Sequence, residues 1–185
     1  MIGNTTMAVL CVACFGSFAW AVKGHFRSRG SAPTGMRVIS VASLASMAWF
    51  LERLLVDDLA SYWVIAAAMV VVAFGLFWWT VRTTELRRLT LAFDDDQPTF
   101  LNRQGPYRWI RHPFYASYIL FWIATSLATP GVLSWVVPVC FMAIYVVAAT
   151  KEESKFEASS LAPEYSRYRS CTGMLLPFSW RWPKD

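Results

Sequence analysis

Hydrophobic positions along the chain are gathered into long runs, separated by short stretches rich in charged and turn-forming residues. Runs of roughly 20 mainly apolar residues have the length that an α-helix needs to cross a bilayer. No basic residue precedes the first run, so we expect it to be a retained span and not a cleaved signal peptide. The sequence therefore predicts an all-α integral membrane protein with about five transmembrane helices. The runs are Met7 to Val22, Val38 to Val56, Tyr62 to Val81, His112 to Ala128, and Val132 to Thr150.

The last two runs are predicted to form an antiparallel helical hairpin, because Thr129, Pro130 and Gly131 between them form a tight turn signal. After the hairpin, apolar and aromatic residues recur at roughly helical spacing up to Tyr168. This spacing predicts an amphipathic C-terminal helix that caps the hairpin. We find no internal repeat or flexible linker, so we expect one membrane domain over residues 1–185, with a three-helix scaffold in 1–81 and a cofactor-binding loop, hairpin and cap in 82–185.

Composition and charge agree with a membrane protein. The chain is 56% hydrophobic, which is more apolar surface than 185 residues can hide in one small core. The net charge of +5 does not indicate a nucleic-acid partner, because the basic residues follow the predicted topology. All of the Lys and Arg residues except Arg53 fall on one side, and the positive-inside rule places that side, with the C-terminus, in the cytosol and the N-terminus outside. The cytosolic set is Lys23, Arg27, Arg29, Arg37, Arg82, Arg87, Arg88, Arg103, Arg108, Arg111, Lys151, Lys155, Arg167, Arg169, Arg181 and Lys184.

We expect no metal site. Cys11 and Cys14 lie inside an apolar run without a histidine at metal-ligand spacing. The carboxylates of Asp94, Asp95 and Asp96 are consecutive, so they point in different directions and cannot form one coordination shell by themselves.

Residues suited to chemistry gather where the last two runs meet the cytosol. Arg111 and His112 stand at the start of the fourth run, and Glu152 and Glu153 follow the fifth. A hairpin brings these two ends to one membrane face. Pro113 suits the first turn of a helix, whose free amides can receive an anion. The alternative is a structural one, in which the basic and aromatic residues anchor a helix in the headgroups and the acidic pair begins a solvated helix.

These residues form part of a series of motifs that resembles the isoprenylcysteine carboxyl methyltransferases. The order and spacing of the motifs agree over residues 98 to 177. The broader group includes phospholipid N-methyltransferases, and some membrane sterol reductases are similar over the same part. The motifs are GPY at Gly105 to Tyr107, RHPFY at Arg111 to Tyr115, KEE at Lys151 to Glu153, PEYSRY at Pro163 to Tyr168, and TGMLLP at Thr172 to Pro177.

The resemblance implies an S-adenosylmethionine-dependent methyltransferase with its cofactor on the cytosolic face and a lipophilic substrate that enters from the bilayer. The expected reaction is O-methylation of a prenylcysteine-like carboxylate. Phospholipid headgroup N-methylation is a close alternative, an NADPH-dependent membrane reductase a more distant one, and a non-enzymatic scaffold a third. The cofactor-binding residues implied are Thr99, Phe100, Leu101, Asn102, Tyr107, His112, Pro113, Phe114, Tyr115 and Glu153, with Glu152 as a neighbour.

One departure from the family bears on the acceptor. The carboxyl methyltransferases have an arginine four residues before the cofactor-binding glutamate, and this chain has Ala149 there. A carboxylate acceptor has no proton to lose, whereas an amine must lose one, for which His112 or Glu152 is the nearby base. Methyl transfer itself needs no metal and no covalent nucleophile. The sequence leaves the acceptor, the catalytic base and the oligomeric state open.

Overall fold

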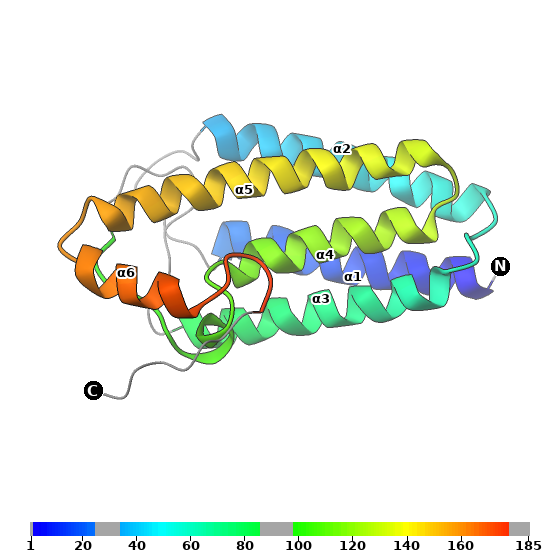
Figure 1. The fold of residues 1–185 in the computed structure, drawn as a ribbon. Helices are drawn as coiled ribbons and strands as arrows, with labels where there is room; N and C mark the ends of the chain where they lie inside the picture. Colours follow the sequence, from blue (N-terminus) through cyan, green and yellow to red (C-terminus); the bar gives the residue numbers. More distant parts are fainter. Residues whose placement is uncertain (1, 25–33, 86–97, 178–185) are drawn as a thin grey trace.

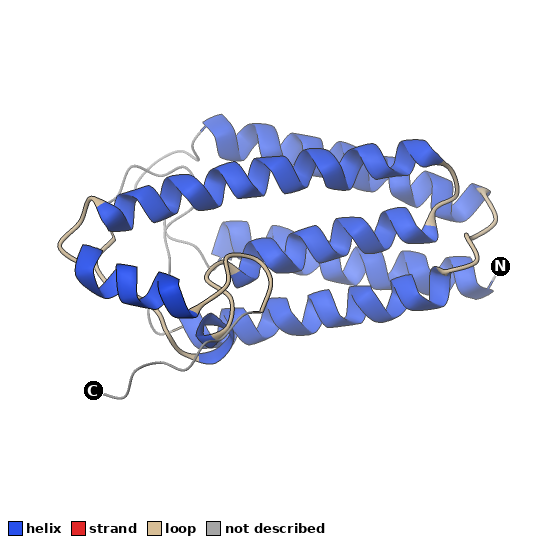
Figure 2. Ribbon diagram, viewed as in Figure 1, coloured by secondary structure: helices blue, strands red, loops and turns tan. Residues whose placement is uncertain are grey.

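The computed structural model describes residues 2–24, 34–85 and 98–177, and within these ranges the chain is mainly helical (Figure 2). Of the residues discussed above, Arg27, Arg29, Arg87, Arg88, Asp94, Asp95, Asp96, Arg181 and Lys184 lie outside the described residues. The α-helices are α1 (Ile2–Gly24), α2 (Thr34–Val56), α3 (Trp63–Thr84), α4 (Pro113–Ala128), α5 (Val136–Glu157) and α6 (Ala162–Cys171). Two short 3₁₀ turns, η1 (Gly105–Arg108) and η2 (Val132–Trp135), precede α4 and α5.

Helices α1 to α5 lie side by side in an elongated bundle, and α6 covers one end of it (Figure 1). Helix α4 occupies the centre, because it packs mainly against α3 and also contacts α1, α2 and α5. Eleven of its 16 residues are buried. Large aromatic side chains such as Phe77, Phe121 and Trp122 fill the space around it. Since α4 follows directly from His112, its central place fixes where the candidate chemistry lies.

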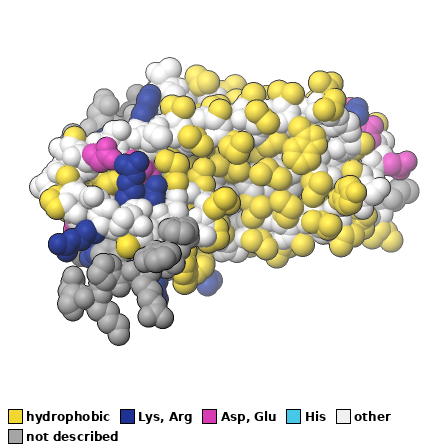
Figure 3. Space-filling view, viewed as in Figure 1, with side chains coloured by type: hydrophobic (Ala, Val, Ile, Leu, Met, Phe, Trp, Pro, Cys, Tyr) yellow, Lys and Arg dark blue, Asp and Glu magenta, His cyan; other side chains and the backbone are white. Residues whose placement is uncertain are grey.

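The outer surface of the bundle has the character of a membrane protein. On the face shown in Figure 3, apolar side chains cover the length of the bundle, while charged side chains lie at its two ends. In the described part of the chain, four helical segments are long and apolar enough to cross a membrane: Ile2–Val22, Thr34–Val56, Trp63–Thr84 and Val132–Glu157. The sequence therefore indicated an all-α integral membrane protein correctly. Helix α4 has 16 residues, so it is only about 24 Å long, less than the ~30 Å of a hydrocarbon core, and a fifth span stays a prediction.

Helices α4 and α5 run antiparallel, as the turn residues predicted. Gly131 has a φ of 94°, a conformation that favours glycine. The Ser134 hydroxyl donates a hydrogen bond of 2.7 Å to the Gly131 carbonyl, and the Ser126 hydroxyl donates one of 2.8 Å to the Ser134 carbonyl. These hydrogen bonds pair buried polar groups of the turn, at the end of the hairpin opposite to the candidate site. Helix α5 continues about two turns past the predicted end at Thr150, so both candidate glutamates belong to the helix itself.

The C-terminal cap is helical and amphipathic, as predicted. In α6 the side chains of Tyr165, Tyr168 and Cys171 are buried at three-residue spacing, while the residues between them are exposed. Helix α6 contacts α5 and lies at the end of the bundle where α4 begins. It therefore covers the end of the hairpin that carries the candidate site.

Candidate functional site

Residues 110–112, directly before α4, are hydrogen-bonded to residues 173–174, directly after α6. Ile110 and Gly173 form an isolated parallel β-bridge. The backbone amide of Arg111 donates to the Gly173 carbonyl at 2.8 Å, and that of His112 donates to the Met174 carbonyl at 3.1 Å. The chain thus returns to the start of α4 after the cap. Because the hairpin also ends here, three separate parts of the sequence meet at one end of the bundle.

A buried ion pair joins these parts. The Glu153 carboxylate on α5 accepts a hydrogen bond of 2.8 Å from Nε of Arg111, and both side chains are less than a tenth exposed. Arg111 also donates to the backbone carbonyls of Arg169 and Thr172, at the end of α6. Nε of Arg169 lies 3.6 Å from the second carboxylate oxygen of Glu153. The guanidinium of Arg111 therefore ties the start of α4 to the ends of α5 and α6.

His112 stands between the two glutamates. Its Nε2 lies 3.1 Å from Oε1 of Glu153, and its Nδ1 lies 3.5 Å from Oε2 of Glu152. Burial alone lowers the pKa of His112, but the hydrogen bonds and negative charges of Glu152 and Glu153 outweigh burial and raise the pKa above its usual 6.5. An imidazole with a carboxylate on each nitrogen favours the doubly protonated form, since both nitrogens can then donate. The two glutamates therefore favour the charged form of His112.

Tyrosines line the rest of the cluster. The Tyr115 hydroxyl donates to Oε1 of Glu152. The ring of Tyr115 stacks on His112 at 5.6 Å and on Tyr145 of α5 at 5.5 Å between centroids. These rings form a continuous aromatic wall beside the acidic pair, of the kind that favours a cation.

The cap supplies a second tyrosine layer. The Tyr168 hydroxyl donates to the Tyr107 carbonyl at 2.7 Å, which fixes η1 under α6. Burial, together with the nearby Tyr168 and Glu152, raises the pKa of Tyr107 well above 10, so its hydroxyl stays protonated. The buried hydroxyl of Tyr165 makes no hydrogen bond of good geometry within the described part of the chain. An unpaired buried hydroxyl is costly, so this atom is available to a bound polar group.

The structure brings together six of the residues expected from the sequence: Tyr107, His112, Pro113, Tyr115, Glu152 and Glu153. Phe114 instead packs into the apolar core, with its ring 5.6 Å from that of Phe77 on α3. Thr99, Phe100, Leu101 and Asn102 form an irregular stretch, neither helix nor strand, before η1. Arg103 next to that stretch pairs with Glu164 of α6 at 2.9 Å, so the stretch lies close to the cap. Which of these residues bind a cofactor stays a prediction.

The sequence motifs did not assign a role to Arg111, Arg169 or Tyr165. The signal for Arg111 was present, since it adjoins His112 at the helix mouth. Its partner Glu153 is 42 positions away, however, and no local pattern pairs the two residues. Arg169 and Tyr165 lie in the predicted cap, where helical spacing indicated a buried face but not the carboxylate that both approach.

The fold and site thus define a helical membrane protein with a buried ionic cluster at one end of its bundle. Residues 60–162 match the phospholipid methyltransferase family. The matched range includes all of α3, α4 and α5. It also includes all six of the clustered residues that were expected to bind a cofactor. The chain therefore belongs to the phospholipid methyltransferase family.

Curated relatives carry a related name. The chain is 30% identical over 122 residues to a methanethiol S-methyltransferase of Mycobacterium tuberculosis, which covers 60% of this chain and 47% of the relative. It is also 30% identical over 95 residues to a methanethiol S-methyltransferase of Crocosphaera subtropica, covering 50% of this chain and 36% of the relative. The chain spans less than half the length of these two relatives.

Proposed function

We propose that this protein is an S-adenosylmethionine-dependent methyltransferase that acts on a substrate resident in the membrane. The observation that carries the proposal is the buried Glu153 carboxylate, held by Arg111 and His112 at the mouth of α4. The family to which the chain belongs supports the same activity. We place the site on the cytosolic side, because the basic residues gather at this end of the bundle.

The cluster fits the proposed cofactor. Among the described residues, Arg111 and His112 engage Oε1 of Glu153, whereas Oε2 lies at the longer distance of 3.6 Å from Arg169, so this oxygen can accept from a hydroxyl or ammonium donor. The buried Tyr165 hydroxyl, which lies near Glu153 and has no hydrogen bond of good geometry to a described residue, is a second polar anchor. The stacked rings of Tyr115 and Tyr145 offer π faces to a sulfonium cation. S-adenosylmethionine, when bound, supplies an electrophilic methyl group on a positively charged sulfur.

The acceptor is best described as a neutral amine or thiol. Ala149, one turn before Glu153, is fully buried and carries no charge that could hold an acceptor carboxylate. Glu152 is a carboxylate with its side chain one third exposed, and it can take the proton that an amine or thiol loses as its nitrogen or sulfur receives the methyl group. Both ring nitrogens of His112 face a glutamate, at 3.5 Å and 3.1 Å, so His112 serves to orient the two carboxylates. This ranking reverses the preference for a carboxylate that the sequence motifs implied.

The relatives' names favour the thiol within this class. A lipophilic thiol and a phospholipid amine can both reach the site from the bilayer, so an experiment must decide between these two acceptors. We expect no nucleic-acid partner, since the charge is explained by topology.

The test is transfer of radiolabelled methyl from S-adenosylmethionine to a panel of acceptors by the purified protein in lipid nanodiscs. The panel is a long-chain alkanethiol, phosphatidylethanolamine and a prenylcysteine analogue. We expect labelling of the thiol or the phospholipid amine. Glu152→Gln should lose at least about a hundredfold in turnover, the lower end of what general-base catalysis contributes. Labelling of the prenylcysteine analogue alone would overturn the acceptor class. Oxidation of NADPH without any labelling would point to the reductase alternative.

A further inference from the structure

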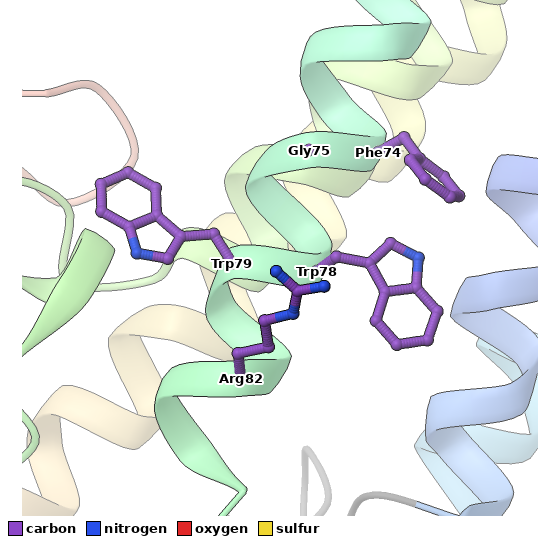
Figure 4. Close-up of a pocket in the computed structure, with 5 residues that line it drawn as sticks. All are labelled: Phe74, Gly75, Trp78, Trp79 and Arg82. Carbon is purple, nitrogen blue, oxygen red and sulfur yellow. The ribbon is translucent and has the colours of Figure 1, made fainter.

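We propose that a groove on the outer side of α3 binds one membrane phospholipid, with its phosphate at Arg82 and an acyl chain over Gly75. The groove has a volume of about 570 Å³ and is lined by Phe74, Gly75, Trp78, Trp79 and Arg82 (Figure 4). It is separate from the ionic cluster, and its occupant is a bound lipid, not the methyl acceptor.

The groove opens toward the bilayer. Its lining residues are spaced at one, four, five and eight positions along α3, so they share one face of the helix. The opposite face is buried, and there Phe77 meets Phe114 of the central helix. Phe74 and Trp79 are exposed by 38% and 45% on the lining face. In a helix that crosses the membrane, an exposed apolar face meets lipid, so a lipid molecule is the occupant that the surroundings supply.

The floor of the groove is a glycine. A Cβ added at Gly75 would meet no atom within 4 Å, so the missing side chain leaves open space against the helix backbone. The rings of Phe74 and Trp78 stand beside it (Figure 4). A side chain at this position would fill the path that an acyl chain takes along α3.

The two tryptophan walls are held in place by neighbouring elements. The indole N–H of Trp78 donates to the Ser17 hydroxyl of α1 at 3.3 Å, and its ring stacks on Trp20 at 5.3 Å. Trp79 contacts Trp109, after η1, at 5.7 Å. The walls thus come from three parts of the chain, and a ligand between them loses little affinity to side-chain ordering.

The positively charged side chain of Arg82 lies at the polar end of the groove. The Arg82 side chain extends between Trp78 and Trp79 (Figure 4). Across the described ranges no carboxylate forms an ion pair with it. Tryptophan marks the headgroup level of a bilayer, and arginine binds phosphate oxygens at that depth. The charge at one end and the open apolar floor at the other match the phosphate and acyl chain of a phospholipid.

The experiment is native mass spectrometry of the detergent-purified full chain titrated with phosphatidylglycerol. We expect one saturable lipid, with affinity about fivefold weaker in Arg82→Gln, from the contribution of one basic residue near a membrane surface, and lost in Gly75→Leu. Diacylglycerol, which lacks the phosphate, should bind at least about fivefold more weakly for the same reason.

Two matched variants serve as controls. Gly16 on α1 is exposed and also has no atom near an added Cβ, and Arg37 is an exposed arginine on α2. Gly16→Leu and Arg37→Gln should leave phosphatidylglycerol binding unchanged. Equal effects of groove and control variants, or equal binding of diacylglycerol, would overturn the proposal. Neither outcome bears on methyl transfer, since the measurement uses no cofactor.

Discussion

Replacing Arg111 with methionine should destabilise the protein strongly, because it leaves a carboxylate buried without its main partner. Both side chains of the pair with Glu153 are less than a tenth exposed. Removing one member of such a pair costs about 3–5 kcal/mol. The change also deprives the Arg169 and Thr172 carbonyls of a donor. Since about 1 kcal/mol shifts the melting temperature by ~2–4 °C in a chain of this size, we expect a fall of roughly 6–20 °C.

The assay is intrinsic tryptophan fluorescence during heating of the protein in detergent. Arg103→Met is the matched control, because Arg103 pairs with Glu164 at 2.9 Å but the two side chains are 44% and 40% exposed. Such a surface pair contributes at most about 1 kcal/mol, so this control should lose no more than about 4 °C.

A double variant tests whether the loss of stability comes from the unpaired charge of Glu153 or from other effects of the substitution. Arg111→Met with Glu153→Leu removes both charges, and apolar replacement of a whole buried pair is often neutral. We expect the double variant to recover at least half of the loss. A double variant no more stable than Arg111→Met alone would refute the reasoning. An Arg111→Met protein with the same melting temperature as Arg103→Met would refute it too.

Three further predictions concern the cluster and its sidedness. Tyr115→Phe keeps the stacked ring but removes the donor to Glu152, so the free energy of unfolding should fall by about 2 kcal/mol; an unchanged melting temperature contradicts that bond. The raised pKa of His112 means that its charged form stabilises the fold fully below pH 6.5 and that this contribution is lost as the pH rises through the folded-state pKa. The melting temperature of the wild type should therefore fall as the pH is raised above 6.5, and a His112→Asn protein with the same slope would exclude His112 as the cause. A fluorescent protein fused to the C-terminus should fluoresce in a bacterial host while a C-terminal alkaline phosphatase fusion stays inactive, and the reverse pattern would place this end outside.

Much of the fold follows from the apolar runs, because a bilayer demands long helices that satisfy their own backbone. The runs predicted the five helices α1 to α5 and the turn at Gly131. They missed the extension of α5 to Glu157, since hydropathy marks where a helix leaves lipid and not where it ends. Nor did they show that α4, only 16 residues long, would be the buried centre.

The site was predicted in position but not in its pairings. A hairpin places both of its open ends at one face, so His112 and the two glutamates had to be neighbours. The direction in which each side chain points depends on how α4 and α5 are rotated about their axes, and the sequence does not encode this locally. Hence the contact of Arg111 with Glu153 emerges only in the structure.

Calorimetric titration of the purified protein with S-adenosylhomocysteine tests the central claim most directly, because it needs no knowledge of the acceptor. We predict saturable binding to the wild type and to Glu157→Gln, whose side chain on the same helix is half exposed. Binding should be at least tenfold weaker in Glu153→Gln, measured well below its melting temperature. Absence of binding to folded wild type, or equal binding by the two variants, would contradict a methyltransferase site at Glu153.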